Sequence, residues 1–388
     1  MKGLWAGVYL VVILRLLPRY RQVGGLVSAN KCFLLFLLFC LCSVRWSVDA
    51  RLTLQKGIPL LFSALIGLDF ARRYTIGEQV RLIWRVLALV AVLGVIAQVF
   101  FPGFVPDLDY EADGAWNGIV TTKNTWARLI VLAGILLLSR PRPTRQSKIV
   151  ITFLMIIVMA LLVASRSAGG LLIMFTMLLL FAGFRALRWP RPHLILLTMT
   201  LALASAGTVS YVFQHADEAT RMLGKDSSMT GRVPIWTEAL RFARHNPIWG
   251  YGYSAFWSQN SRPGRLVREA VNWDALPHAH NGYIDLLLQV GTIGLALYFA
   301  TYLIAMKRAV LLVRRNTAIE LRWPLAFLCV VFLYQLNEAS IVSPNQLIWI
   351  LFSSVLFSLA IEDQSSELPL QEEENQAAPG QPALLAGD

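Results

Sequence analysis

Uninterrupted apolar runs recur through most of this chain and leave it few possible folds. Each run of about 17 to 25 residues is long enough for a helix that crosses the roughly 30 Å hydrocarbon core of a bilayer. Charged residues make up only 15% of the sequence, whereas a soluble protein carries about 25%. Because the runs are continuous and do not alternate with polar residues, they argue against a membrane β-barrel. The sequence therefore predicts an all-α, polytopic transmembrane helical bundle.

About eleven runs are predicted to span the membrane, and ten to twelve would fit the pattern. They cover residues 3–17, 31–46, 57–70, 83–101, 118–138, 148–165, 168–184, 193–213, 282–305, 322–337 and 345–361. The first run could pass for a signal peptide, but basic residues follow it and no small-residue cleavage site does, so we expect a retained helix.

Basic residues gather in every second loop between these runs. The five basic loops contain Arg19, Arg21 and Lys31; Arg72, Arg73 and Arg81; Arg140, Arg142, Arg145 and Lys148; Arg185, Arg188 and Arg191; and Lys307, Arg308, Arg314 and Arg315. Basic loops stay in the cytoplasm. We therefore expect a multi-pass protein with its N-terminus outside and its C-terminus cytoplasmic. Basic residues scattered in this way do not favour a nucleic-acid partner.

The runs and loops divide the chain into four parts. Residues 1–213 form the N-terminal transmembrane helices, and 214–281 form one large polar loop on the outer side. Residues 282–361 form the C-terminal transmembrane helices. Residues 362–388 are acidic, contain no basic residue and are rich in Gln, Pro and Ala, so we expect a disordered cytoplasmic tail.

The large loop is where polar chemistry has room to occur. It holds four of the five histidines, which are His215, His245, His278 and His280. A helix is predicted from Pro234 to His245, because apolar residues recur there at helical spacing. The glycine-rich turn that follows, around Tyr251, suits either the membrane boundary or stacking on a sugar.

Three side chains stand out as candidates for catalysis. Arg166 lies at the outer end of a span, where the charge pattern does not call for it, and an arginine at a membrane edge is a functional candidate unless it only anchors the helix. Arg232 lies near a helix start and could hold a diphosphate, or be solvated. His280 could accept a proton at neutral pH, or cap the next span. His278 could equally be the reactive histidine.

Metal sites are predicted to be absent. The acidic residues Asp107, Asp109, Glu111 and Asp113 lack the glycine and the terminal glutamate of an EF-hand loop, and a solvated acidic loop explains them better. An H-x-H pair without further ligands at familiar spacing is not a zinc site. The four cysteines lie in apolar runs and suggest neither a metal site nor disulfides.

These motifs, taken in order, resemble the O-antigen ligase and O-antigen polymerase superfamily over residues 115–300. The resemblance rests on Ser165 to Gly170, Gly231-Arg232 with Trp236, Pro247 to Gly252, His278-Ala279-His280-Asn281, and Gly291 with Gly294. One departure is Gln289, where members often have glutamate; Asp285, one turn earlier, is the candidate to stand in for it.

The resemblance implies a helical fold of the GT-C type and an inverting glycosyltransferase without metal or cofactor. The donor would be a glycan on undecaprenyl diphosphate, and the acceptor another glycan or lipid A core. Other polysaccharide-assembly proteins are possible partners. The resemblance also implies a protein of the bacterial inner membrane, with the 214–281 loop and the active site in the periplasm. Arg166 and Arg232 would hold the diphosphate, and His280 would orient or deprotonate the acceptor. We also expect substrate contacts from Lys123, Arg128, His278, Asn281, Trp236 and Tyr251.

The motifs favour a polymerase over a ligase. Two segments resemble those of exopolysaccharide and O-antigen polymerases. They are Trp116-Asn117-Gly118 with Lys123-Asn124, and the sequence of residues 279–283. An O-antigen ligase is the alternative within the family. A transporter or flippase is a third reading, but charges are sparse in the middle of the spans, where transport sites lie.

Overall fold

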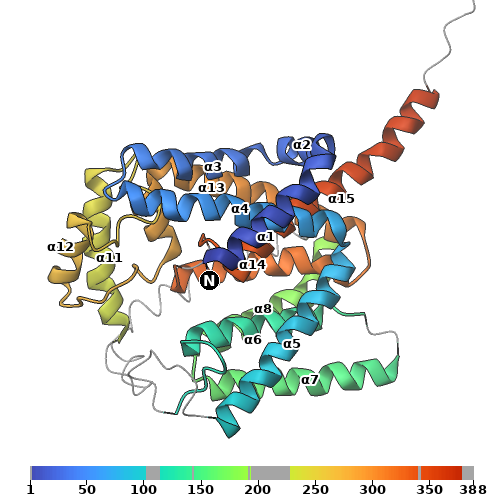
Figure 1. The fold of residues 1–388 in the computed structure, drawn as a ribbon. Coiled ribbons are helices and arrows are strands. Elements are labelled where there is room, and N and C mark those ends of the chain that lie inside the picture. The colour runs from blue at the N-terminus through green and yellow to red at the C-terminus, as the bar shows by residue number, and fades with distance from the viewer. Residues whose placement is uncertain are drawn as a thin grey trace, which may run out of the picture.

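The polypeptide folds as a bundle of long helices with a smaller helical unit at one end (Figure 1). The structure, a computed structural model, describes residues 2–101, 114–141, 144–190, 193, 228–339 and 342–377, and these contain no strand. The helices are α1 (Lys2–Leu16), α2 (Tyr20–Ala29), α3 (Lys31–Cys42), α4 (Ala50–Arg73), α5 (Ile76–Phe100), α6 (Lys123–Leu138), α7 (Arg145–Ala164), α8 (Ala168–Gly183), α11 (Ser228–His245), α12 (Arg262–Ala270), α13 (Gly282–Arg315), α14 (Trp323–Asn337) and α15 (Leu347–Ala377).

Seven helical stretches of the described residues are long and apolar enough to cross a membrane. They are Gly3–Ala29, Ala50–Arg73, Ile76–Phe100, Arg145–Ala164, Ala168–Arg188, Gly282–Arg315 and Leu347–Ser365. Three further expected spans are shorter helices, α3, α6 and α14, and the expected span 193–213 lies almost wholly outside the described residues. Large apolar side chains of α5 and α7 remain exposed, as on helices that face lipid. The chain is a multi-pass helical membrane protein.

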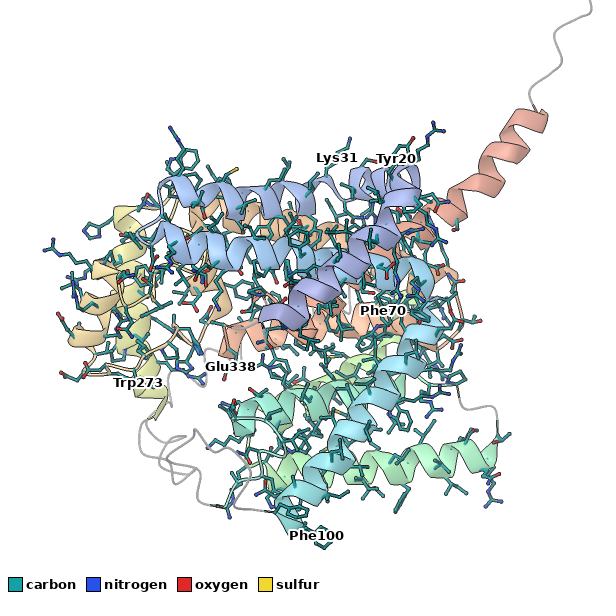
Figure 2. The ribbon with its side chains drawn as sticks, viewed as in Figure 1. Tyr20, Lys31, Phe70, Phe100, Trp273 and Glu338 are labelled. Atoms are coloured by element: carbon teal, nitrogen blue, oxygen red, sulfur yellow. The ribbon has the colours of Figure 1, made fainter. Side chains whose placement is uncertain are left out.

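Four of the five predicted basic loops contact one another at one end of this bundle. Arg72 donates a hydrogen bond to Gln22, and Arg308 donates to Asn30. Arg188 donates to the carbonyl groups of Val313 and Asn316. Figure 2 shows Tyr20 and Lys31 at this end, away from Trp273 and Glu338. The predicted alternation of loops therefore corresponds to two distinct ends of the bundle.

The other end carries the described part of the large loop, residues 228–281. Its helices α11 and α12 share a small apolar core of their own, which also includes the first turns of α13; its buried members are Ile235, Ala239, Ala243, Phe256, Val267, Leu276, Ala279 and Leu288. The predicted loop helix is confirmed, although it begins at Ser228 and contains Pro234. The loop is thus a folded unit, and residues 214–227 lie outside the described residues.

A break in α13 joins this unit to the membrane helices. Gly291 has φ +62° and ψ −168° inside the helix, a conformation reserved for glycine. A Cβ there would lie 2.1 Å from the carbonyl oxygen of Ile248. The backbone groups freed by the break pair with the glycine-rich turn: Tyr251 N–H donates to Leu288 and Gly252 N–H to Gln289. The turn therefore serves to seat the loop on α13.

The C-terminal segment differs from expectation. Helix α15 continues beyond the membrane segment to Ala377 and extends away from the bundle (Figure 1). The sequence from 362 to 377 is rich in Glu, Gln, Leu and Ser, of which Glu, Gln and Leu favour helix. The part of the acidic tail predicted to be disordered up to 377 is therefore helical, and 378–388 lie outside the described residues.

Candidate functional site

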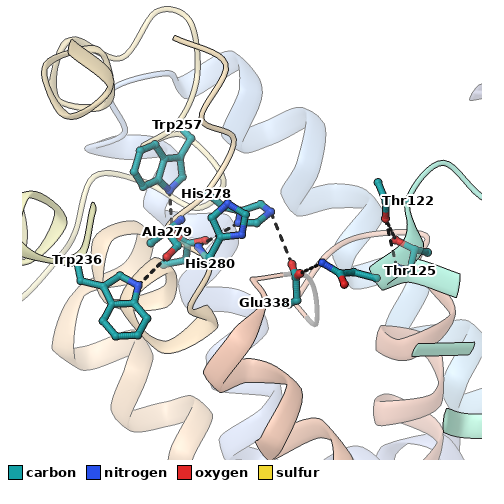
Figure 3. Close-up of polar contacts among 10 residues, drawn as sticks. Thr122, Thr125, Trp236, Trp257, His278, Ala279, His280 and Glu338 are labelled. Carbon is teal, nitrogen blue, oxygen red and sulfur yellow. Dashed lines mark hydrogen bonds and ion pairs between the residues drawn. The ribbon is translucent and has the colours of Figure 1, made fainter. Parts of the chain in front are cut away.

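The segment His278-Ala279-His280 is held in place through its middle residue. The backbone N–H of Ala279 donates to Oδ1 of Asp285 at 3.1 Å, and the carbonyl group of Ala279 accepts from the Trp236 indole at 2.8 Å. The same Asp285 oxygen also accepts from the Trp257 indole at 2.8 Å. Figure 3 shows Trp257, Ala279 and Trp236 on one side of the two imidazole rings and Glu338 on the other. The peptide between the two histidines is therefore fixed, and their imidazole rings lie next to each other.

His280 has an unusual backbone conformation and an unpaired ring nitrogen among the described residues. Its backbone lies in the left-handed region at φ +51°, which costs a non-glycine residue about 1–3 kcal/mol and occurs often at functional sites. Its Nε2 atom is buried and has no hydrogen-bond partner among the described residues. The ring stacks on Trp273 with centroids 5.6 Å apart. An acceptor hydroxyl could pair with this free nitrogen.

His278 has both ring nitrogens directed at the protein. Its Nδ1 accepts a hydrogen bond from the backbone N–H of His280 at 3.1 Å. Its Nε2 lies 4.0 Å from Oε2 of Glu338, at the C-terminal end of α14. The two imidazole rings lie edge to face with centroids 4.3 Å apart. The environments of the two histidines therefore differ, although their sequence positions look alike.

A chain of hydrogen bonds continues from Glu338 into the membrane helices. The Asn124 amide donates to Oε1 of Glu338 at 3.2 Å. The Oδ1 of Asn124 accepts from the Ser167 hydroxyl at 3.0 Å. Ser167 caps α8 and directly follows Arg166. Side-chain contacts thus connect the histidine segment to the turn that carries Arg166.

Positive charge surrounds the two histidines. Burial, with added repulsion from Arg128 and Arg232, lowers the pKa of His278 to about 4. Burial also lowers the pKa of His280; His278 and Arg232 act in the same direction, and the carboxylate of Glu338 opposes them. Arg128 from α6 and Arg232 from α11 therefore lie close enough to act on the same ring. Both histidines are neutral at pH 7, and an anion would be attracted to their surroundings.

Arg166 lies at the tip of the α7–α8 turn. Its backbone is also left-handed, at φ +51°, and the residue is exposed. Its guanidinium group lies over Gly114, where a Cβ would be 3.8 Å from Nη2. The next residues pack along the same turn, since Trp116 N–H donates to the carbonyl group of Ala164 at 3.0 Å. Arg166 is thus placed by the turn and by the segment that precedes α6.

The other predicted site residues have structural contacts. Asn281 caps α13, with its side-chain oxygen accepting from the N–H groups of Tyr283 and Ile284. Tyr251 donates its hydroxyl to the carbonyl group of Phe242. Lys123 is the first residue of α6.

The structure refines the expected position of Arg232 and the expected roles of Gln289 and Asp285. Arg232 lies one turn inside α11 and not beside its first residue. Gln289, which stands where family members often have glutamate, accepts from the backbone N–H of Ser254 at 2.7 Å. One carboxylate oxygen of Asp285 accepts hydrogen bonds from the backbone N–H of Ala279 and from the indole of Trp257. These contacts give Gln289 and Asp285 roles in seating the loop.

One group of side chains in the described part of the chain has the composition of a metal site. Ligand atoms of His278, His280 and Glu338 lie within 4.8 Å of one another. Two histidines and a glutamate are a familiar zinc set. However, Nδ1 of His278 already accepts a hydrogen bond, so the ring proton of the neutral form belongs on the nitrogen that faces Glu338. With Arg128 and Arg232 nearby as well, the arrangement suits an anionic substrate better than a cation.

Glu338 is the site residue that sequence reasoning missed. It lies between the last two predicted spans, 40 or more residues beyond the recognisable motifs. A single acidic side chain at the end of an otherwise apolar helix was the available signal, because such groups are costly near a membrane and tend to be functional. Asn124 was noticed only as a neighbour of Lys123, and nothing in the sequence pairs it with Glu338.

The candidate site lies between the helical bundle of a membrane protein and a folded loop. Residues 153–299 match the family described as O-antigen ligase, and this stretch includes Arg166, Arg232, His278 and His280. The resemblance to the O-antigen ligase and polymerase superfamily is confirmed. The exopolysaccharide production protein ExoQ of Rhizobium meliloti (strain 1021) is 26% identical over 319 residues, which cover 76% of this chain and 67% of the relative.

Proposed function

We propose that this protein transfers a glycan from undecaprenyl diphosphate to a sugar hydroxyl, and so polymerises exopolysaccharide or O-antigen repeat units. The observation that carries the proposal is the convergence of Arg128 and Arg232 on His278, beside a second histidine whose buried Nε2 has no hydrogen-bond partner among the described residues. An anionic leaving group and a hydroxyl acceptor are the two partners that such a site suits.

The reaction follows from these groups. The acceptor oxygen attacks the anomeric carbon of the donor sugar, and the bond from that carbon to the diphosphate oxygen breaks. The diphosphate leaves with the bonding electrons, and the guanidinium groups of Arg166 and Arg232 neutralise its growing charge. The hydroxyl proton passes to His280. Attack from the face opposite the leaving group inverts the anomeric configuration, and no metal is required.

His280 is the better candidate for the acceptor because of its free Nε2 atom. A general base must have an unshared lone pair within reach of the hydroxyl. The Nδ1 lone pair of His278 is occupied by a backbone N–H, whereas Nε2 of His280 is buried and has no hydrogen-bond partner in the part of the chain that the structure describes. Its lowered pKa keeps the ring neutral at pH 7, so that the lone pair of Nε2 is available to the hydroxyl.

We further propose that the site faces the periplasm and that the protein resides in the bacterial inner membrane, with its C-terminus cytoplasmic. The grouping of basic loops at the opposite end supports this orientation. The partners would then be the lipid bilayer, the lipid-linked donor and a glycan acceptor, together with other polysaccharide-assembly proteins.

The relative's name favours exopolysaccharide, and the family match favours a ligase as the second candidate. An O-antigen ligase would use the same arginines and the same histidine but place lipid A core at the acceptor position. The structure of the glycan made by a deletion strain distinguishes these functions. A lost polymerase leaves single repeat units or no polymer, a lost ligase leaves long chains on undecaprenyl diphosphate, and a lost flippase leaves donor in the cytoplasmic leaflet.

Complementation links this experiment to the site. The wild-type gene should restore polymer, and a His280→Ala gene expressed to the same level should not. Accumulation of long lipid-linked chains in the deletion strain would instead identify a ligase, and accumulation of cytoplasmic donor would reject both transferase functions.

A further inference from the structure

We propose that Glu338 is a positioning residue that orients the catalytic histidine segment through His278. The inference rests on the proposed function, in which His280 is the acceptor's base, and adds a residue outside the matched family region. Glu338 would fix which nitrogen of His278 carries the proton, and His278 would in turn hold the backbone of His280 in its left-handed conformation.

The first step concerns the tautomer of His278. A neutral imidazole has one N–H donor and one acceptor nitrogen. Since Nδ1 accepts the backbone N–H of His280 at 3.1 Å, the single ring proton belongs on Nε2. That nitrogen faces Oε2 of Glu338 at 4.0 Å, and a carboxylate can only accept. The two contacts therefore favour the same tautomer.

The second step concerns the backbone of His280. The contact from the Nδ1 of His278 to the N–H two residues later closes a short turn, much as an asparagine side chain does. His280 at φ +51° needs such support, because a left-handed histidine is costly on its own. The side chain of His278 therefore determines where the imidazole of His280 points.

The third step concerns what holds Glu338. Asn124 donates to its Oε1, and Ser167 fixes the Asn124 amide by donating to Oδ1. Glu338 is thus tied to α6 and to the α7–α8 turn, and it faces the loop with its second oxygen. This chain of contacts fixes the position of the Arg166 turn relative to the His280 segment. Transfer of a group between two bound substrates requires such fixed positions.

Several charged groups act on these two rings and enter any pH measurement. Arg128 of α6 and Arg232 of α11 act on His278, and Arg232 and Glu338 act on His280. Because Glu338 favours the protonated form of His280, its removal should lower the pKa of that ring further and weaken it as a base. Glu338→Gln should therefore lower kcat and move the acid limb of the rate profile to lower pH.

The direct test is the side-chain ¹⁵N spectrum of the full-length protein in detergent, labelled at histidine. Only five histidines contribute, and His278→Asn identifies the signal of interest. We expect His278 to be neutral at pH 7 with its proton on Nε2, and Glu338→Gln to disturb that state. Glu320→Gln is the matched control, because Glu320 lies just before the first residue of α14 and Glu338 just after the last one. It should leave the protonation state of His278 unchanged. A wild-type His278 with its proton on Nδ1 would overturn the proposal.

A double-mutant cycle supplies the kinetic test. If Glu338 acts through His278, Glu338→Gln should slow transfer about 10-fold or more in the wild-type background and much less in a His278→Ala background. His278→Asn, which can still accept the N–H of His280, should retain more activity than His278→Ala. If Glu338→Gln slows transfer by the same factor in the wild-type and His278→Ala backgrounds, the inference is refuted. A purified protein that transfers no glycan would refute the proposed function, while the ¹⁵N spectrum would still decide the role of Glu338.

Discussion

The indole ring of Trp273 stacks on the imidazole of His280, with their centroids 5.6 Å apart and their planes at 20°. Burial is the largest cause of the lowered pKa of His280. Trp273→Ala should expose the ring and raise its pKa toward the ordinary value. A base must be neutral to act, so the acid limb of the rate profile should move to higher pH, which initial rates between pH 4 and 8 would show.

The matched control for this variant is Trp189→Ala, which removes an exposed indole from the opposite end of the bundle. It should leave the profile where it is. An acid limb that does not move in Trp273→Ala would mean that the titrating group is not His280.

The arginines should behave differently from the histidine. Arg166→Ala and Arg232→Ala remove charge from the diphosphate, so both should weaken donor binding and lower kcat. Lysine should rescue only in part, because an ammonium group cannot form a forked contact. Donor binding and turnover measured on the same purified variants test this. Arg241→Ala, which removes an exposed arginine of α11 paired with Glu238, is the control; an equal loss there would indicate a general effect of charge.

Transfer should not depend on a divalent metal. The arginines neutralise the leaving group, and a hydrogen bond to Nδ1 makes His278 a poor metal ligand. Purified enzyme should keep its rate in excess EDTA, measured with lipid-linked donor. Loss of activity that added Mg²⁺, Mn²⁺ or Zn²⁺ restores would contradict this. The cluster of His278, His280 and Glu338 would then be the place to look for zinc, and the 107–113 segment the place to look for the harder cations.

Much of the fold could be predicted because the bilayer constrains it strongly. Apolar runs show where the helices cross the bilayer, and basic residues show which loops share one side of it. Both patterns follow from whether a segment lies in lipid or in water. The break at Gly291 could not be predicted, because a glycine inside an apolar run is common. Its conformation depends on the carbonyl of Ile248, more than 40 residues earlier, and no local pattern records that contact.

The site was predictable only in its polar, recognisable parts. Arg232, His278 and His280 stand out in a polar loop, and Arg166 stands out as a basic residue at the outer end of a span. The pairing of His278 with Glu338 is a contact between residues 60 positions apart. It distinguishes the two histidines by their hydrogen-bond partners, which the H-A-H motif alone cannot do.

The orientation in the membrane can be tested with single cysteines in a variant that lacks the four native ones. Gln259 in the loop and Gln146 near the start of α7 are both exposed, whereas Ser258 is buried and would label poorly. An impermeant thiol reagent should label Gln259→Cys in intact spheroplasts and leave Gln146→Cys unlabelled until the membrane is broken. The opposite labelling would reverse the topology.

The most direct test of the account is glycan transfer by purified protein reconstituted with an undecaprenyl-diphosphate-linked donor and its acceptor. We predict that the wild type extends the glycan and releases the lipid diphosphate. His280→Ala should bind donor as before and transfer about 10²–10⁴ times more slowly. His278→Asn should lose less, and His245→Ala, which changes an exposed histidine of α11, should lose nothing. Wild-type transfer by His280→Ala, or an inactive His278→Asn beside an active His280→Ala, would contradict the account.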